Sequence, residues 1–143
     1  MKMNIIGKLS WLTEDEQVDV HSPDDALAAI RDVDEESRSR PIALEVTRPD
    51  GEVMMIILGD DRSCLAWWPK DYKGMGSKHT VAEGFDPERD RIPSNPEVIT
   101  YYFFGHHNEV PMQYTIPKEK AFQAVREFLL SPGPASCVRW EMD

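Results

Sequence analysis

The sequence predicts an α+β domain, with a mainly antiparallel sheet of about five to seven strands and two helices packed on one face. Two observations predict this class. Strand-like segments cluster in the middle of the chain and are joined by short turns, and a helix-like segment stands on either side of that cluster. We expect residues 1–143 to form a single domain, because this length suffices for one core and is too short for two.

The first elements are a strand within Asn4 to Trp11 and a helix that follows Ser22. Ser22 can accept a hydrogen bond from a free backbone N–H at the helix start, and Pro23 suits the first helical position, where no N–H is needed. An apolar stripe at helical spacing then marks the face that packs on the sheet. The stripe consists of Ala26, Leu27, Ile30 and Val33, and it stops at Asp34, Glu35 and Glu36.

A meander of three strands is predicted next. The segment Ile42 to Thr47 places its larger apolar residues at alternate positions, as expected for a half-buried strand. Val53 to Leu58 is apolar at every position, so we expect a central strand that is covered on both faces. Arg48-Pro49-Asp50-Gly51 supplies a tight turn between these strands, and Gly59-Asp60-Asp61 turns the chain into a third strand at Ser63 to Trp68.

Residues 69–96 differ from the rest of the chain, because they are rich in glycine, proline and charged residues. We expect a long irregular segment there, of the kind that is usually functional or mobile, with an edge strand near His79 to Ala82. The remaining strands and the second helix follow this segment. These are strands at Val98–Phe104, Gln113–Ile116 and Ser136–Trp140, and a helix that begins at Pro117 and ends at Ser131-Pro132-Gly133-Pro134.

The net charge is −10, and the acidic residues are unevenly distributed. Residues 1–61 contain 15 acidic and 6 basic residues, a net −9, whereas residues 62–143 contain 11 and 10, a net −1. This distribution argues against binding to nucleic acid or to an anionic membrane, because phosphates would be repelled. It favours a basic protein partner, and an acidic surface that only maintains solubility is the alternative.

Two cysteines, Cys64 and Cys137, are too few for a disulfide scaffold. We interpret both as buried thiols in apolar strand patterns, where they behave as small hydrophobic residues. The start of the chain has no apolar stretch long enough for a signal peptide or a membrane span. We therefore expect a cytoplasmic protein.

Few residues indicate catalysis or metal binding. His106 and His107 are adjacent on an extended segment, so their side chains point to opposite faces and are poorly placed to share a metal ion. A nucleophilic pair would need Cys64 or Cys137 near His106, but a thiol within an apolar strand is inert. Gly74 to Lys78 lacks the spacing of a phosphate-binding loop. We predict no enzymatic activity, no cofactor and no metal site.

Aromatic residues are concentrated at Trp67-Trp68 and at Tyr101-Tyr102-Phe103-Phe104. Neighbours on a strand face opposite sides, so two helices on one face of the sheet leave part of each set on the other face. Two interpretations remain open. The sheet has aromatic residues on both faces, one of them covered by the long loop, or they form an anchor patch that serves a foreign partner or a homodimer.

The last third of the chain carries motifs of a known family. An aromatic run followed by Gly105-His106 and by Glu109-Val110-Pro111 precedes Ile116-Pro117, and Cys137-Val138-Arg139-Trp140 closes the pattern. Together these motifs resemble the Imm-one family of immunity proteins from bacterial polymorphic toxin systems, over about residues 98–142. The earlier strands and the first helix agree with that family in order and length.

This resemblance implies a small α+β protein that binds and neutralises a cognate toxin protein domain, such as a nucleic-acid deaminase or a nuclease, without enzymatic activity. Toxins of this kind are commonly basic around the substrate cleft, and an acidic inhibitor can occupy such a cleft. A small enzyme with a Cys/His or metal site, or a structural subunit of a larger assembly, are the alternatives.

Acidic and aromatic residues are our candidates for the toxin-facing surface. They are Asp34, Glu35, Glu36, Asp60 and Asp61, with Trp67, Trp68 or Tyr72 as anchors. The family-motif residues are expected to be mainly structural, and in that role His106 donates to a carbonyl and Glu109 accepts from a neighbouring amide. The motif residues are Gly105, His106, Glu109, Pro111, Cys137 and Trp140.

Overall fold

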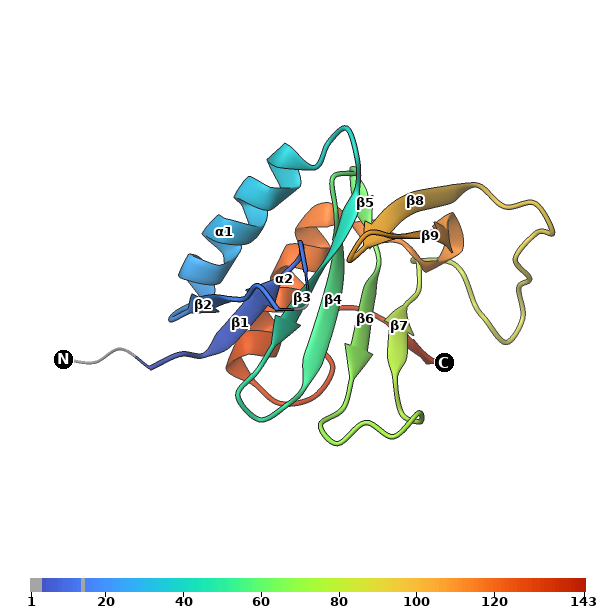
Figure 1. Ribbon diagram of the computed structural model, residues 1–143. Coiled ribbons are helices and arrows are strands. Elements are labelled where there is room, and N and C mark those ends of the chain that lie inside the picture. Colours follow the sequence, from blue (N-terminus) through green and yellow to red (C-terminus); the bar gives the residue numbers. More distant parts are fainter. Residues whose placement is uncertain (1–3, 14) are drawn as a thin grey trace.

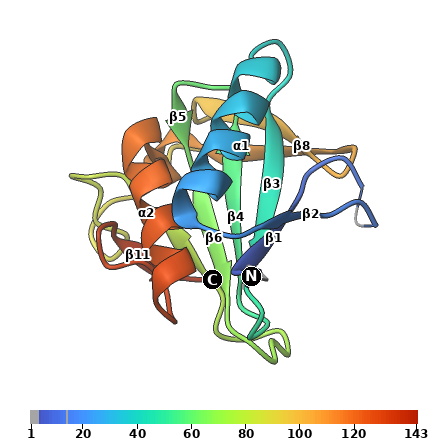
Figure 2. The same ribbon diagram turned by 90° about the vertical axis from the view of Figure 1, so that its left-hand side faces the viewer.

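The computed structural model describes residues 4–13 and 15–143, which form a sheet with two helices on one face and a β-hairpin on the other (Figure 1). The strands are β1 (Gly7–Ser10), β2 (Val18–Val20), β3 (Ile42–Thr47), β4 (Val53–Leu58), β5 (Arg62–Ser63), β6 (Leu65–Trp68), β7 (Lys78–Thr80), β8 (Val98–Phe103), β9 (His106–Pro111), β10 (Ile116–Pro117) and β11 (Trp140–Met142). The helices are α1 (Pro23–Glu36), α2 (Lys118–Leu130) and a short 3₁₀ helix (Met112–Tyr114). Figure 2 shows α1 and α2 side by side across one face of the sheet.

Within the described residues, the main sheet has nine strands, and seven of them follow the order β11-β7-β6-β4-β3-β1-β2. The strand pairs are antiparallel except for β3 with β8, which is parallel and aligns Ile42 with Tyr102. The predicted α+β class with two helices on one face is confirmed. The main sheet has more strands than the five to seven predicted, in part because β2 and β9 were not predicted from the sequence.

Both helices begin where the sequence predicts. The Ser22 hydroxyl accepts a hydrogen bond from the Asp25 N–H (3.0 Å), and Pro23 is the first residue of α1. Helix α2 follows Pro117 directly and ends before Ser131. The part of the chain that the structure describes contains no helix long and apolar enough to cross a membrane.

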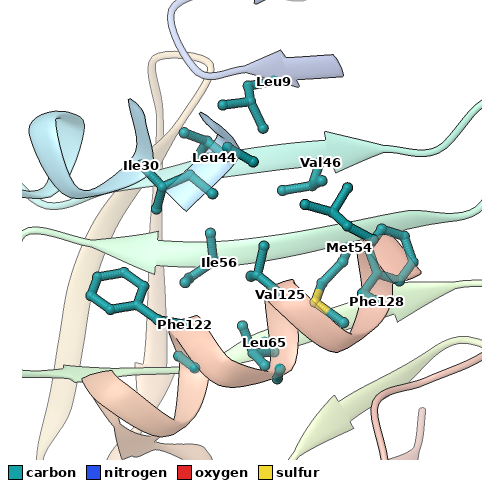
Figure 3. Packing of buried hydrophobic residues seen from close by; sticks show 14 of the residues in the cluster. Leu9, Ile30, Leu44, Val46, Met54, Ile56, Leu65, Phe122, Val125 and Phe128 are labelled. Carbon is teal, nitrogen blue, oxygen red and sulfur yellow. The ribbon is translucent and has the colours of Figure 1, made fainter. Parts of the chain in front are cut away.

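Strand β4 is covered on both faces, as its unbroken apolar sequence predicts. The side chains on its helix side pack in one cluster with Val125 and Phe128 of α2 (Figure 3). On the opposite side, Ile57 packs in a second cluster with Ile99 and Val110 of the β8–β9 hairpin. The residues of β4 on the helix side are Met54, Ile56 and Leu58. The second face of the sheet is therefore covered by the hairpin, and not by the long loop proposed from the sequence.

Two predicted strands take a different form around the second helix. The segment 113–116 lies partly in the 3₁₀ helix, because the N–H and the hydroxyl of Thr115 both donate to the Met112 carbonyl (3.0 and 2.7 Å) and close a tight turn. Only Ile116 of that segment enters a strand. The final strand begins at Trp140, because it pairs with β7 through Trp140–Met142.

The predicted strand at residues 63–68 is interrupted at Cys64. The Ser63 hydroxyl donates to the Ile57 carbonyl (2.8 Å), which holds the chain against β4 at this point. Strand β5 then pairs with β10 in a separate two-stranded ladder, whereas β6 continues the main sheet beside β4. The predicted strand near His79 is present as β7, but it is not an edge strand, because it pairs with β6 on one side and with β11 on the other.

A buried ion pair joins the helices to the sheet. The Asp34 carboxylate at the end of α1 is 4% exposed, and it accepts hydrogen bonds from Lys118 Nζ (2.6 Å) and the Gly59 N–H (2.7 Å). Arg38 also contacts it at 3.2 Å. Gly59 has φ +100°, and a Cβ atom there would lie 2.2 Å from the Ser37 carbonyl oxygen, so the close approach requires glycine. One carboxylate therefore connects α1, the turn after β4, and the start of α2.

The charge of Asp34 is stabilised by these partners. Burial raises the pKa of this carboxyl group, but the hydrogen bonds from Lys118 and Gly59, with the charges of Lys118 and Arg38, outweigh burial and lower it below 3.8. Because the pKa is lowered in the folded state, ionised Asp34 stabilises the fold at all pH values above its unfolded pKa. That contribution is lost as the pH falls through the folded-state pKa.

We predict that Asp34→Asn lowers the free energy of unfolding near neutral pH by about 3 kcal/mol, because it leaves the buried Lys118 without a charged partner. Urea unfolding followed by circular dichroism, repeated from neutral pH down to about pH 3, measures the difference from the wild type. This difference should shrink toward acid pH. Asp32→Asn, at an exposed position of α1, is the matched control and should change little. A cost that stays constant with pH would contradict the prediction.

Candidate functional site

Four of the predicted acidic residues lie at the surface, at the end of the molecule where α1 stops. Glu35 and Glu36 belong to the last turn of α1 and are exposed, and Asp60 and Asp61 lie in the turn after β4. Asp61 accepts a hydrogen bond from Arg38 (2.8 Å), and Asp60 accepts one from the Arg62 N–H (3.2 Å). Glu35, Glu36, Asp60 and Asp61 are therefore accessible at one end of the molecule. Asp34 is not, because it is committed to the buried pair with Lys118.

This acidic end also contains basic side chains. A hollow of about 240 Å³ lies between α1 and the start of α2, and Arg31, Arg38 and Lys118 line it together with Asp34, Glu35 and Asp61. Arg31 forms two hydrogen bonds with Glu119 (3.1 and 3.2 Å). Much of the charge at this end is therefore paired within the protein, and Glu35 and Glu36 are the acids most available to a partner.

The two adjacent tryptophans have different environments. Trp67 is 9% exposed, belongs to the cluster beneath the helices, and donates its indole N–H to Glu52 Oε1 (3.0 Å). Trp68 points to the other face and, with Tyr72 and Phe103, lines a hollow of about 260 Å³. Trp67 is therefore a core residue and cannot anchor a partner as predicted. Trp68 and Tyr72 remain candidates.

The predicted anchors and acids do not form one patch. Val53, beside Trp68 in the sheet, and Leu58, before the acidic turn, are the two ends of β4. A strand of this length spans roughly 17 Å. The hollow at Trp68 also lies on the hairpin side of the sheet, away from the helices.

The motif around Gly105 forms the turn of the β8–β9 hairpin. Gly105 and Phe104 both have positive φ angles (84° and 48°), as a tight two-residue hairpin turn requires. His106 and Glu109 are exposed on β9, and neither side chain makes a hydrogen bond within the described residues. The expected bonds from His106 to a carbonyl and from an amide to Glu109 are therefore not formed. Pro111 ends β9, opposite Val98.

The closing motif residues pack near the end of α2. Trp140 donates its indole N–H to the Ala135 carbonyl (2.7 Å) and packs against the cluster under the helices, which is a structural role. Cys137 lies before β11 and is half-buried, and neither cysteine lies within a strand, so the prediction of buried strand thiols is confirmed only for the burial of Cys64. Cys64 lies between β5 and β6 and is buried.

Neither thiol is activated as a nucleophile. Burial raises the pKa of the Cys64 thiol to about 11, and burial also raises the pKa of Cys137. Cys64 lies near the Thr80 hydroxyl (3.5 Å), whereas His106 is exposed on the hairpin. In the ranges 4–13 and 15–143, no three His, Cys, Asp or Glu side chains are grouped to hold a metal ion.

An apolar surface on the β1–β2 connection was missed in the sequence. Leu12 is 63% exposed and Val18 is 44% exposed, and with Trp11 they line a hollow of about 330 Å³. The Ser10 hydroxyl donates to the carbonyls of Thr13 and Glu16 (2.8 and 3.0 Å), which ties these two residues to the end of β1. We refer to the surface of Trp11, Leu12 and Val18 as the β1–β2 patch. The signal in the sequence is the apolar pair Trp11-Leu12, separated by Thr13 from a run of acidic residues.

Acidic residues surround the β1–β2 patch. Asp15 and Glu16 line the same hollow, and Asp19 lies on β2, the last strand in the sheet order. An apolar centre with a charged rim is the usual composition of a protein–protein interface. The fold and its surfaces therefore define a small α+β protein with an apolar, acid-rimmed surface at one edge of its sheet.

The comparison with protein families agrees with this class. The family model of Immunity protein Imm1, the Imm-one family, matches residues 14–142, and the chain belongs to this family. The resemblance found in the last third of the sequence is thereby confirmed and extends over nearly the whole chain. Members of this immunity protein family are generally not enzymes. No curated protein matches the chain.

We predict that Trp67→Phe lowers the free energy of unfolding by about 2 kcal/mol, because it removes a buried hydrogen bond to Glu52 and leaves a cavity. Glu52 would keep its bond from the Gly133 N–H (2.8 Å). Urea unfolding measures the loss. Trp68→Phe on the other face is the matched control and should cost less, since Trp68 is only half-buried. Equal costs for the two substitutions would contradict the different roles assigned to them.

Proposed function

We propose that this protein binds a cognate toxin domain and neutralises it by covering a basic surface of that domain. Membership of the Imm1 family carries this proposal, because an immunity protein implies a toxin partner. The acidic surface supports a toxin that is basic, as a nucleic-acid deaminase or nuclease would be around its substrate cleft. The protein acts in the cytoplasm in this proposal, and its two free thiols are compatible with a reducing compartment.

Charge distribution supports a basic partner. Residues 1–61 carry a net −9, and they build α1 and the strands from β1 to β4. Strand β2 ends the sheet, and α1 follows it directly along the chain and packs beside it. The acidic excess therefore belongs mainly to one side of the protein. Opposite charges on two proteins accelerate their encounter and suppress wrong partners.

The β1–β2 patch supplies the apolar contact area in this proposal. Truncation of a few buried apolar or aromatic residues usually causes most of the loss in binding free energy at an interface, whereas acidic rim residues act mainly on the association rate. We therefore place Leu12 and Val18 at the centre of the toxin interface and Glu35, Glu36, Asp60 and Asp61 toward its rim. The hollow at Trp68 and Tyr72 is a second contact area, available to the toxin or to another copy of this chain.

The first test is co-purification. The tagged protein is expressed with the C-terminal toxin domain encoded by the neighbouring gene, and the complex is examined by size-exclusion chromatography with light scattering. A stoichiometric, salt-sensitive complex and rescue of cells from the toxin are expected. The mass of the free protein also shows whether it forms a homodimer. If no complex forms and the toxin domain is not inhibited, the proposal fails for that partner.

We predict that Leu12→Ala weakens toxin binding by about 1–2 kcal/mol, because it removes an exposed apolar contact at the centre of the interface. Isothermal titration calorimetry measures the affinity. Leu130→Ala is a closely matched control, because Leu130 is 64% exposed but lies at the end of α2. Equal effects of the two substitutions would place the β1–β2 patch outside the interface.

Reversing charge on α1 should act on the rate of association. We predict that Glu35→Lys with Glu36→Lys lowers the association rate constant about tenfold at low salt and weakens its salt dependence. Stopped-flow mixing measures both. Glu88→Lys with Glu97→Lys changes the net charge equally in the long loop and should have a smaller effect. Identical salt dependence for both double variants would show that only total charge matters.

A further inference from the structure

A cavity of about 350 Å³ lies beside the start of α2. Its walls come from β5, β10, the segment after β7, and the connection between α2 and β11. Its volume is within the range of small-molecule sites, which is about 300–1,000 Å³. The residues that surround it lie outside both the β1–β2 patch and the acidic end of α1. The cavity lies outside the β1–β2 patch, and it adjoins the acidic turn after β4 at Arg62, whose N–H donates to Asp60.

Basic side chains converge on this cavity, although the protein as a whole is acidic. Arg62, Lys120 and Arg139 line it, and Glu83 is the acidic residue among its lining. Within the described residues, none of the three basic side chains lies at ion-pair distance from a carboxylate. Seven other lysine and arginine residues form such pairs, and they are Lys8, Arg31, Arg38, Arg48, Arg89, Lys118 and Arg126. Five further basic residues of the described chain form none, but they are not gathered at one cavity, and they are Arg40, Lys70, Lys73, Lys78 and Arg91.

Neutral groups of the protein hold Arg62 in place and also contact Arg139. Arg62 donates from Nε to the Thr115 hydroxyl (2.8 Å) and from Nη2 to the Thr115 carbonyl (2.8 Å). Arg139 donates from Nη1 to the Phe85 carbonyl (3.4 Å). A guanidinium has five N–H donors, so both arginines keep donors for another acceptor. These partners are neutral, so an anion at this point would be attracted by all three basic side chains. Glu83 in the lining, and Glu127, which accepts a hydrogen bond from the Ser136 hydroxyl (2.8 Å), oppose this attraction.

Much of the remaining wall is apolar, and Ser136 adds a hydroxyl. Val81 and Ile116 are almost fully buried at the cavity, and Val138 also lines it. Cys137 adds a thiol, and because burial raises its pKa it stays protonated at neutral pH. A fully hydrated inorganic ion would leave this apolar area in contact with water. An anion with an apolar stem would cover the area and reach the cations.

We propose that this cavity binds a carboxylate that carries a short apolar group, either a free organic acid or an acidic residue of a bound protein. Polyanions such as nucleic acid are disfavoured, because the surrounding protein carries a net charge of −10. A single carboxylate meets three basic side chains, and its apolar stem contacts the half-buried Cys137 and Val138 above Val81 and Ile116. This site does not depend on the proposed toxin binding.

The experiment uses hexanoate and its neutral analogue hexanamide as probes. Each is titrated into the ¹⁵N-labelled full chain, and amide shifts are followed by NMR. Hexanoate is expected to shift residues around Cys137 and Ile116 with a dissociation constant in the millimolar range or below, and hexanamide at least about fivefold more weakly. Hexanoate should also slow the reaction of Cys137 with N-ethylmaleimide. Equal binding of the two probes, or shifts located elsewhere, would overturn the proposal.

Two substitutions test the cations without disturbing the fold. Lys120→Gln with Arg139→Gln removes two exposed charges and leaves Arg62 on Thr115. Hexanoate affinity should fall by about fivefold or more, whereas Lys73→Gln with Arg91→Gln, at exposed positions outside the cavity, should leave it unchanged. Unchanged affinity in the first double variant would rule out charge recognition at this site.

The same titration on the purified toxin complex distinguishes the two sources of carboxylate. If the complex no longer binds hexanoate, and Lys120→Gln with Arg139→Gln weakens the complex, an acidic residue of the toxin occupies the cavity. If the complex binds hexanoate as the free protein does, the ligand is a free organic acid. Failure of the toxin complex to form would contradict the proposed function, but hexanoate binding by the free chain would still support the cavity.

Discussion

The contact between Asp34 and Lys118 determines how the layers of this protein fit together. The two residues are 84 positions apart in the sequence. The Gly59 N–H, in the turn after β4, donates to the same carboxylate and so connects the sheet to both helices. A buried carboxylate is tolerable only when its hydrogen-bonding capacity is met by partners, and here an ammonium, a guanidinium and an amide meet it. This requirement fixes the end of α1 relative to the start of α2. The neighbouring acids Glu35 and Glu36 are exposed because α1 is held in this position.

Both faces of β4 are covered, and this determines which aromatic residues belong to the core and which remain accessible to a partner. The helices take the face of Trp67, and the β8–β9 hairpin takes most of the other face. What stays accessible is the margin of the sheet, at the β1–β2 patch, at Trp68 and Tyr72, and at the turn after β4. An immunity protein built in this way presents the ends and edges of its sheet, while the broad faces serve the core.

Local signals in the sequence were enough to predict the helices and strands. Long-range contacts determine which of the candidate site residues are buried, and these contacts could not be predicted from the sequence. Ser22, Pro23 and the apolar run of β4 act within a few residues, so the helix start and the central strand followed from them. Alternation shows that Trp67 and Trp68 face opposite sides but does not say which side the helices cover. Asp34 stands four residues after Ile30, on the apolar stripe, which was a signal of burial. Its partner Lys118 is too distant in the sequence to be inferred from spacing.

The order of synthesis follows from the way β4 is covered. Residues 53–58 leave the ribosome well before the hairpin at 98–111 and α2 at 118–130, which together bury both sides of that strand. Contacts of such high sequence separation form late, and unfinished chains expose apolar strand surface in the meantime. Both faces of β4 can therefore be covered only after α2 has been synthesised.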